Sequence, residues 1–193
     1  MELIKNTITK FFYAEMIWLV IPLISAVVPI ENEKTKIIFP VHNESRVDIK
    51  ADIKFIIQAS EGGLMEVKLG QLAQNNASSS EVKKFGKIMI EDHSKTNVEI
   101  SVLAHGKEIV LSGKPNKKLQ TKYQVLAKKT GADFDKAYIS FMIADHKDDI
   151  AEFEKEVQNG KDSEIKNWAL NKIPVLKHHL HLANEACASL KKH

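Results

Sequence analysis

Residues 80–105 read SEVKKFGKIMIEDHSKTNVEISVLAH, a pattern typical of an α-helix with one apolar face. Its apolar residues, joined by one histidine and one threonine, recur at intervals of three and four residues. This stripe consists of Val82, Phe85, Met89, His93, Thr96, Ile100 and Leu103. Ser78 or Ser79 can cap the start of the helix, and Gly106 is a stop signal after its end. The segment therefore predicts an amphipathic helix with a histidine within its apolar face.

The same spacing continues outward from this segment in both directions. It predicts three further long helices: over 48–75, from Asp133 to near Gly160, and from Asp162 or Ser163 onward. Pro174 falls inside the last of these helices and is expected to kink it or restart it. Residues 106–131 form a long connection that contains a short amphipathic helix over 116–129.

Four long helices in two tight hairpins, joined by a long connection, define the fold class. We predict that residues 48–192 form an all-α domain, an antiparallel four-helix bundle with a long helical crossover connection between its two hairpins. Ferritin-like folds share this topology. The 193 residues leave room for one such domain and a short extra segment, because a domain has roughly 100–200 residues.

The first 26 residues have the features of an export signal. Lys5 and Lys10 precede an apolar run with small residues near Ala26, as in a signal peptide. An uncleaved membrane anchor is the alternative, because about 20 apolar residues can span a bilayer. We predict a signal peptide or uncleaved anchor at residues 1–26 and a linker at 27–47. The protein is predicted to be exported, to the periplasm or the outer membrane, and to meet a membrane only through residues 1–30 if they stay attached.

Charge and motifs exclude several classes of function. The 28 basic and 25 acidic residues give a net charge of +3 and are spread along the chain, whereas nucleic-acid binding needs a clustered basic face. The sequence has no glycine-rich phosphate loop and no nucleophile elbow. We therefore predict no nucleic-acid partner and no catalytic residues, and we favour a role other than catalysis. A homodimer is compatible with the sequence, which identifies no protein partner.

A short motif occurs twice in the chain. Residues 89–93 and residues 142–146 both read Met-Ile-x-Asp-His. In each copy the methionine and the histidine are four residues apart, so they lie on the same face of a helix. The repetition suggests two related hairpins about a pseudo-twofold axis.

Each long helix carries, on its apolar stripe, one polar residue that can bind a metal. The four are Glu66, His93, His146 and His179. Counted from the two hairpin turns, they lie at similar heights, with mismatches of about 7 Å at 1.5 Å per residue. A buried glutamate is destabilising unless it is paired or coordinated, and imidazole suits zinc, copper and iron. We therefore predict a site for one transition-metal ion (zinc, copper or iron) in the bundle core.

Four neighbouring residues have secondary roles in this hypothesis: they are Asp92, Asp145, Met89 and Met142. The aspartates are outer partners of the histidines or alternative ligands, and methionine sulfur would favour copper. The alternative hypothesis is a metal-free structural or interaction protein of the cell envelope. In that case the glutamate and the histidines form a buried polar network, and the methionines fill gaps in the core. His178 and His181 are predicted to lie on the surface.

Five motifs resemble those of a known family. They are Phe55-x3-Ala59-x2-Gly62-Gly63-Leu64-x-Glu66-Val67-x-Leu69-Gly70-x2-Ala73, Met89-x2-Asp92-His93-Ser94-Lys95, Phe134-Asp135-Lys136-Ala137-Tyr138, Met142-x2-Asp145-His146 and Pro174-Val175-Leu176-x2-His179-Leu180-x-Leu182-Ala183. Over residues 50–190 the chain resembles the bacterial family called domain of unknown function 4142. The resemblance implies a ferritin-like helical bundle in exported proteins, often labelled outer membrane proteins, with no established activity. The paired Glu-x-x-His motifs of ferritins are missing, which argues against a di-iron oxidase.

Overall fold

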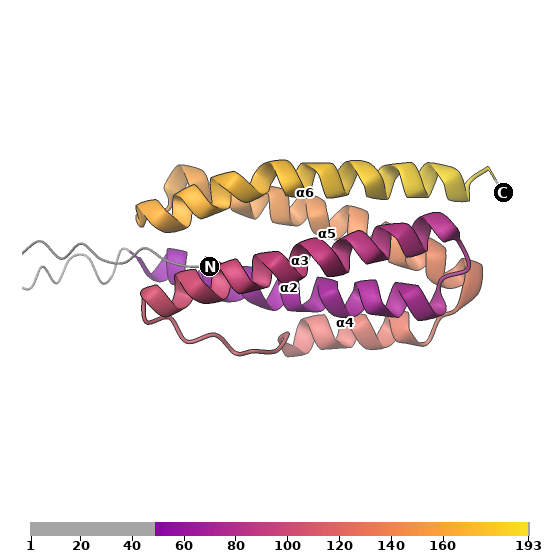
Figure 1. Ribbon diagram of the computed structural model, residues 1–193, viewed down its shortest axis with the longest axis horizontal. Helices are drawn as coiled ribbons and strands as arrows, with labels where there is room; N and C mark the ends of the chain where they lie inside the picture. Colours follow the sequence, from indigo (N-terminus) through magenta and orange to yellow (C-terminus); the bar gives the residue numbers. More distant parts are fainter. Residues whose placement is uncertain (1–48, 193) are drawn as a thin grey trace, which may run out of the picture. The chain divides into compact units, whose positions relative to one another are not determined.

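The computed structural model describes residues 49–192, and this part of the chain is all-α (Figure 1). Its five helices are α2 (Lys50–Asn76), α3 (Ser80–Gly106), α4 (Lys117–Ala127), α5 (Gly131–Asn159) and α6 (Ser163–Leu190). The predicted fold class, all-α, is confirmed. The predicted signal peptide or anchor at 1–26 and the linker at 27–47 lie outside the described residues. No helix within 49–192 is long and apolar enough to cross a membrane.

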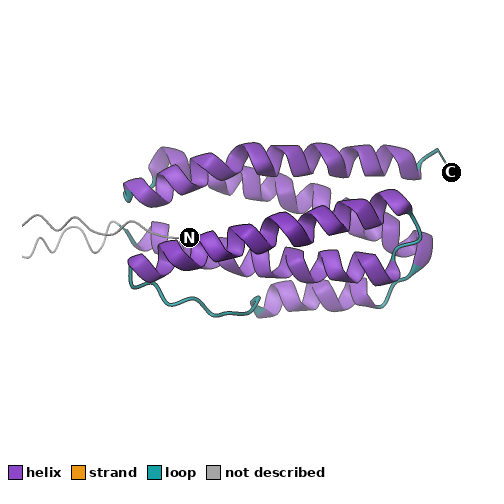
Figure 2. Cartoon of the chain, in the orientation of Figure 1, coloured by secondary structure: helices purple, strands orange, loops and turns teal. Residues whose placement is uncertain are grey.

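The helices form a bundle of two hairpins with a fifth helix beside them (Figure 1). Helix α2 packs along α3 and α5 packs along α6, and the hairpins meet where α2 contacts α5 and α3 contacts α6. The loop after α3 runs back along the bundle to α4 (Figure 2), which contacts α2 and α5. Glu61 of α2 holds this connection by accepting hydrogen bonds from Ser112 Oγ and Asn116 Nδ2, at 3.3 and 2.7 Å.

Side-chain caps explain where two of the helices begin. Ser79 accepts a hydrogen bond from the backbone N–H of Val82 at 3.4 Å, which selects Ser79 as the cap of α3. Asp162 accepts hydrogen bonds from the backbone N–H groups of Glu164 and Ile165 at the start of α6. Each cap satisfies backbone donors that the first turn of a helix leaves without partners.

Two buried aspartates tie the hairpins together. Asp135, near the start of α5, accepts hydrogen bonds from the backbone N–H groups of residues 78–79, at 3.2 and 2.9 Å. Asp52, near the start of α2, does the same for residues 161–162, at 2.8 and 2.6 Å. Each hairpin therefore supplies the carboxylate that satisfies the turn of the other.

This exchange shows how the hairpins are related. A shift of 83 residues takes Asp52 to Asp135, and it also takes the end of α2 to the end of α5 and the start of α3 to the start of α6. The repeated Met-Ile-x-Asp-His motif does not follow this shift, because it lies in α3 and α5, which are not corresponding helices. The inference of two related hairpins thus agrees with the structure, but the two copies of the repeated motif do not occupy equivalent positions in the two hairpins.

A close contact between α2 and α3 depends on two glycines. A Cβ atom added at Gly70 would lie 2.5 Å from the carbonyl oxygen of Gly86, and one added at Gly86 would lie 2.7 Å from Ala73 Cβ. A larger residue at either position would push the two helices apart. Because Gly70 lies one turn after Glu66, this contact sets how closely α2 brings Glu66 to α3.

Helix α6 is continuous from Ser163 to Leu190, with Pro174 inside it. The predicted restart at Pro174 is therefore wrong. A proline leaves the carbonyl four residues earlier, here that of Leu170, without its helical donor. Pro174 is exposed and the Leu170 side chain is 52% exposed, so the defect lies on the face of α6 that water can reach. The unbroken helix holds His179 at a fixed height above the α5–α6 turn.

The apolar core consists of two clusters. One lies toward the α2–α3 turn and includes Leu69, Val82 and Phe134. The other lies toward the α5–α6 turn and includes Ile100 and Ile165. The bundle is therefore stabilised by apolar packing on both sides of its middle, where Glu66 and the three buried histidines are found.

Candidate metal centre

Each long helix contributes one of four buried polar residues that gather near the middle of the bundle, at the boundary between the two apolar clusters. They are Glu66 on α2, His93 on α3, His146 on α5 and His179 on α6, with exposed fractions of 2, 5, 0 and 0%. The ring centroids of the three histidines lie 5.2 to 6.0 Å apart. The structure thus brings all four candidates from the sequence together. His178 and His181 are exposed, as predicted.

Each imidazole has one ring nitrogen hydrogen-bonded to an oxygen that does not belong to the three histidine side chains. His93 Nδ1 lies 2.8 Å from Glu66 Oε2, and His179 Nε2 lies 3.1 Å from Asp92 Oδ2. His146 Nδ1 lies 3.0 Å from the backbone carbonyl oxygen one turn earlier in α5. Because these oxygens accept hydrogen bonds, each of the three nitrogens carries the hydrogen and donates it. The opposite nitrogen of every neutral ring therefore has a bare lone pair.

The three opposite nitrogens have no hydrogen-bond partner. His93 Nε2, His146 Nε2 and His179 Nδ1 are all buried and unpartnered. One nitrogen of each ring also lies within 4.8 Å of a nitrogen from each of the other two rings. A buried acceptor without a donor costs about 1–3 kcal/mol, so this arrangement destabilises the fold unless something binds there.

Burial keeps the imidazoles neutral. Removal from water lowers the pKa of His93, His146 and His179 to about 4 in each case, because the charged ring loses its hydration. The neighbouring carboxylates act to raise these pKa values but do not overcome burial. At neutral pH the rings are therefore in the form that binds metal ions.

Glu66 is held in the same dry environment. Burial raises its pKa to about 8, although the nearby His146 acts to lower it. Glu66 Oε1 lies 3.5 Å from His146 Nε2, and neither atom has a hydrogen-bond partner. When the carboxyl group is ionised, both atoms present lone pairs to each other. A proton or a metal cation between them removes that repulsion.

A group of three carboxyls adjoins the histidines. One oxygen from each of Glu66, Asp145 and Asp149 lies within 4.8 Å of the others. Burial raises the pKa of both aspartates, well above its usual value for Asp149. Lys122, 3.9 Å from Asp145, acts to lower the pKa of that residue. The cluster thus holds carboxyls that are poorly compensated when ionised.

Asp149 is the member of this group that the sequence analysis missed. It lies four residues after Asp145 and therefore on the same face of α5. It is also the residue that the 83-residue shift pairs with Glu66. The spacing of four residues was present in the sequence and could have identified it, whereas the 83-residue shift follows from the helix ends and turn contacts of the structure.

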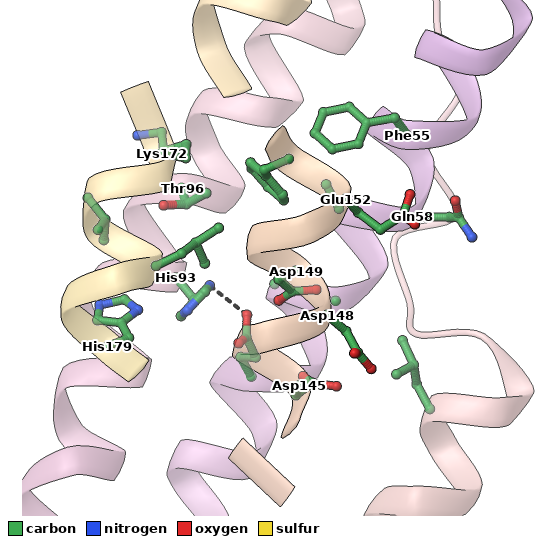
Figure 3. A pocket seen from close by; sticks show the side chains of 18 of the residues that line it. Phe55, Gln58, His93, Thr96, Asp145, Asp148, Asp149, Glu152, Lys172 and His179 are labelled. Carbon is green, nitrogen blue, oxygen red and sulfur yellow. Dashed lines mark ion pairs between the residues drawn. The ribbon is translucent and has the colours of Figure 1, made fainter. Parts of the chain in front are cut away.

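A cavity of about 450 Å³ gives access to both groups. Its walls include all three carboxyls together with His93 and His179. Figure 3 shows Asp145 and Asp149 projecting from α5 and the two histidines across from them. His93 forms an ion pair with Glu66 at 2.8 Å. The exposed residues of the cavity wall connect these groups with solvent.

The four residues with secondary roles in the sequence hypothesis lie in different surroundings in the structure. Asp92 is the hydrogen-bond partner of His179, whereas Asp145 belongs to the group of carboxyls. Met89 and Met142 are buried in the apolar cluster toward the α2–α3 turn. Their side chains therefore fill the core, and the Met142 carbonyl is the acceptor for the ring on α5.

Comparisons with known proteins agree with this fold. The family model described as "Domain of unknown function (DUF4142)" matches residues 42–186. A crystal structure of a protein from Streptomyces coelicolor, described as a candidate secreted protein DUF305, is similar with a TM-score of 0.63 and 12% identity, over 73% of this chain and 92% of that chain. At this identity the likeness shows the fold alone. No curated protein matches the chain.

Proposed function

Because the chain belongs to the DUF4142 family, whose description names no activity, we infer its function from the bundle core and propose that it binds one transition-metal ion there. The ligands in this proposal are His93, His146 and His179, with Glu66 as a fourth. The resemblance to this family found in the sequence is confirmed by the match. We also propose the ferritin-like, antiparallel four-helix topology for the bundle.

The observation that carries the proposal is the state of the three imidazoles. Each ring is neutral and buried, donates its N–H to an outer oxygen, and keeps a bare nitrogen without a partner. Metal-binding histidines have this arrangement, because an outer acceptor fixes the tautomer and orients the ring. Histidines that serve only as hydrogen-bonded core residues would not leave an unpartnered nitrogen on each of three neighbouring rings.

The position of Glu66 suits a fourth ligand. Ligand atoms 2.0–2.1 Å from a tetrahedral ion lie about 3.4 Å apart. Glu66 Oε1 and His146 Nε2 are 3.5 Å apart, close to that separation. An ion on Nε2 of His93 lies on the far side of that ring from Nδ1, so Glu66 must give up its contact with His93 Nδ1 to reach the ion. Three imidazole nitrogens and one carboxylate oxygen favour zinc, copper(II) or iron(II). With both methionines in the apolar core, sulfur ligation is not part of the proposal.

The metal-free polar network is the second candidate, and one observation favours it. Burial raises the pKa of Glu66 to about 8, so at neutral pH a protonated carboxyl can donate to His146 Nε2 across the 3.5 Å gap. Glu66 would then link α2 to α3 and α5 without an ion. The bare nitrogens of His93 and His179 stay unpartnered in this arrangement, which is why we favour the metal.

We propose that the protein acts outside the cytoplasm, in the periplasm or at the outer membrane. The charged and apolar pattern of residues 1–26 supports export, and the similar structure is described as a candidate secreted protein. A metal-binding bundle in that compartment would serve storage, sensing or protection of the envelope from stress.

Elemental analysis tests the proposal. Purified protein, loaded separately with zinc, copper and iron and then dialysed, should retain about one equivalent of at least one metal. His179→Ala should lose it, whereas the adjacent control His178→Ala, which changes an exposed ring on the same helix, should retain it. Retention of none of the three metals by the wild type would overturn the proposal and leave the polar network.

A further inference from the structure

We infer a second cation site beside the histidines, formed by the carboxyl groups of Glu66, Asp145 and Asp149. It would take a hard divalent cation such as manganese or magnesium, which prefers oxygen ligands. Glu66 then bridges two ions, one in each site. The inference rests on the proposed function for the bridging arrangement, and its test separates the two.

The helices deliver these three side chains to one place. Asp145 and Asp149 are one turn apart on the same face of α5, and Glu66 comes from α2, which contacts α5. The 83-residue relation takes Glu66 to Asp149, so corresponding positions of the two hairpins meet across the bundle. One oxygen from each carboxyl lies within 4.8 Å of the others. A cation that draws them in by about 1 Å would bind all three.

An independent observation at Glu66 points to a ligand. Its side chain is 98% buried, and Oε1 has no hydrogen-bond donor. The nearest ring nitrogen, His146 Nε2, cannot supply one in the neutral ring, because the hydrogen is on Nδ1, bonded to the backbone carbonyl. The Glu66 carboxylate has this unpartnered oxygen close to a bare nitrogen and has one oxygen close to two further carboxylates, an environment that cations satisfy.

Charge compensation also favours two ions rather than one. The three imidazoles are neutral, so the negative charges near an ion bound to them are those of Glu66 and of Asp92, the hydrogen-bond partner of His179. Asp145 and Asp149 add two further negative charges when they are ionised. Among the described residues, the cation that pairs with this group is Lys122, 3.9 Å from Asp145. A second divalent cation balances these two carboxylates. Two ions that share a carboxylate lie about 3.5–4 Å apart.

The space for such an ion exists on the open side of the cluster. All three carboxyls line the cavity of about 450 Å³, and a bound water occupies roughly 30 Å³. Gly62, which the 83-residue relation pairs with Asp145, also lines this cavity. A Cβ atom added at Gly62 would meet nothing within 4 Å. Water molecules can therefore complete the six ligands that manganese or magnesium requires.

Sequential loading with two metals tests the inference. The full-length protein is given one equivalent of zinc, then manganese(II), and is dialysed before elemental analysis and electron paramagnetic resonance. We expect retention of zinc and manganese in equal amounts, with the spectrum of protein-bound manganese. Asp149→Asn should keep zinc and weaken manganese binding more than about tenfold. The control is Asp148→Asn, a cavity residue next in the chain but outside the carboxyl group, which should behave as the wild type.

The outcomes separate the two proposals. Zinc without manganese in the wild type overturns the second site and leaves the proposed function intact. Retention of neither metal overturns the second site, and it overturns the proposed function as well if copper and iron are also not retained. Equal manganese binding by the wild type and Asp149→Asn shows that the cation binds elsewhere and also overturns the inference. If Asp149→Asn does not fold, Asp145→Asn takes its place with the same expected loss.

Discussion

Two groups of side chains form a polar layer at the middle of the bundle and respond to burial in opposite ways. The histidine side consists of His93, His146 and His179, and the carboxyl side consists of Glu66, Asp145 and Asp149. On the histidine side, loss of hydration lowers the pKa values and leaves neutral rings. On the carboxyl side, the same loss raises the pKa values and favours protonated acids. Both halves thus tend toward neutrality in the same dry interior. The comparison shows that the bundle can fold around this layer without charges and that cation binding is what would ionise it.

The halves also differ in access. The three histidines are at most 5% exposed, whereas Asp145 and Asp149 are half-buried at the cavity wall. An ion can therefore reach the carboxyls first and the imidazoles from the cavity through His93 and His179. Stability should depend more strongly on the histidine side, because its groups are more completely removed from water.

Acidification of the metal-free protein should give the largest effect. The pKa of each core histidine is about 4 in the folded state against 6.5 for an ordinary histidine. A lowered pKa means that stability is fully present above pH 6.5 and is lost as the pH falls toward 4. Each ring contributes roughly 3 kcal/mol to that loss, at 1.36 kcal/mol per pKa unit. Chemical denaturation at a series of pH values measures it.

Glu66 should make the opposite contribution in the same series. Its pKa is raised from 4.5 to about 8, so its stabilising effect is fully present below pH 4.5 and is lost as the pH rises through about 8. Because three histidines lose stability below pH 6.5 while Glu66 alone gains it, the metal-free protein should be most stable at about pH 7. A stability that stays constant from pH 7 down to pH 4.5 would contradict the neutral, buried state of the histidines.

Zinc binding should give the next largest effect. A ligand present at a thousand times its Kd stabilises the folded state by about 4 kcal/mol, which for a domain of this size raises Tm by roughly 10–15 °C. Calorimetry with zinc and then with excess chelator measures the shift and its reversal. The same melting temperature under both conditions would favour the metal-free network.

Two substitutions of Glu66 should give the smallest effects and distinguish pairing from charge. Glu66→Ala leaves the Nδ1–H of His93 without an acceptor and should cost about 1–3 kcal/mol in the metal-free protein. Glu66→Gln should cost less than about 1 kcal/mol, because its amide can accept from His93 and donate to His146. Both should weaken metal retention. Thermal melts of the metal-free variants measure which substitution lowers stability more. Equal losses of stability would show that the hydrogen bonds of Glu66 contribute nothing.

Several features of the site were readable in the sequence. The spacing of three and four residues placed His93, His146 and His179 on apolar stripes, and each is buried. The position of Asp149, one helical turn after Asp145, was also present in the sequence. The 83-residue relation between the hairpins follows from the helix ends and from the turns that Asp52 and Asp135 cap, whereas the repeated Met-Ile-x-Asp-His motif indicates a different correspondence between the helices. The effect of Pro174 depends on which face of α6 is solvated, which spacing alone does not show.

The sequence by itself determined the helices, their caps and the one polar residue on each apolar face, because these depend on backbone geometry and on neighbours within a few residues. The tertiary structure decided the heights at which the helices meet, through contacts such as Gly70 with Gly86 and the capping of each turn by the other hairpin. It also decided which nitrogen of each histidine donates and which is left bare. Those outcomes depend on partners that are distant in the chain, and a mismatch of a few residues in helix register is enough to separate or join them.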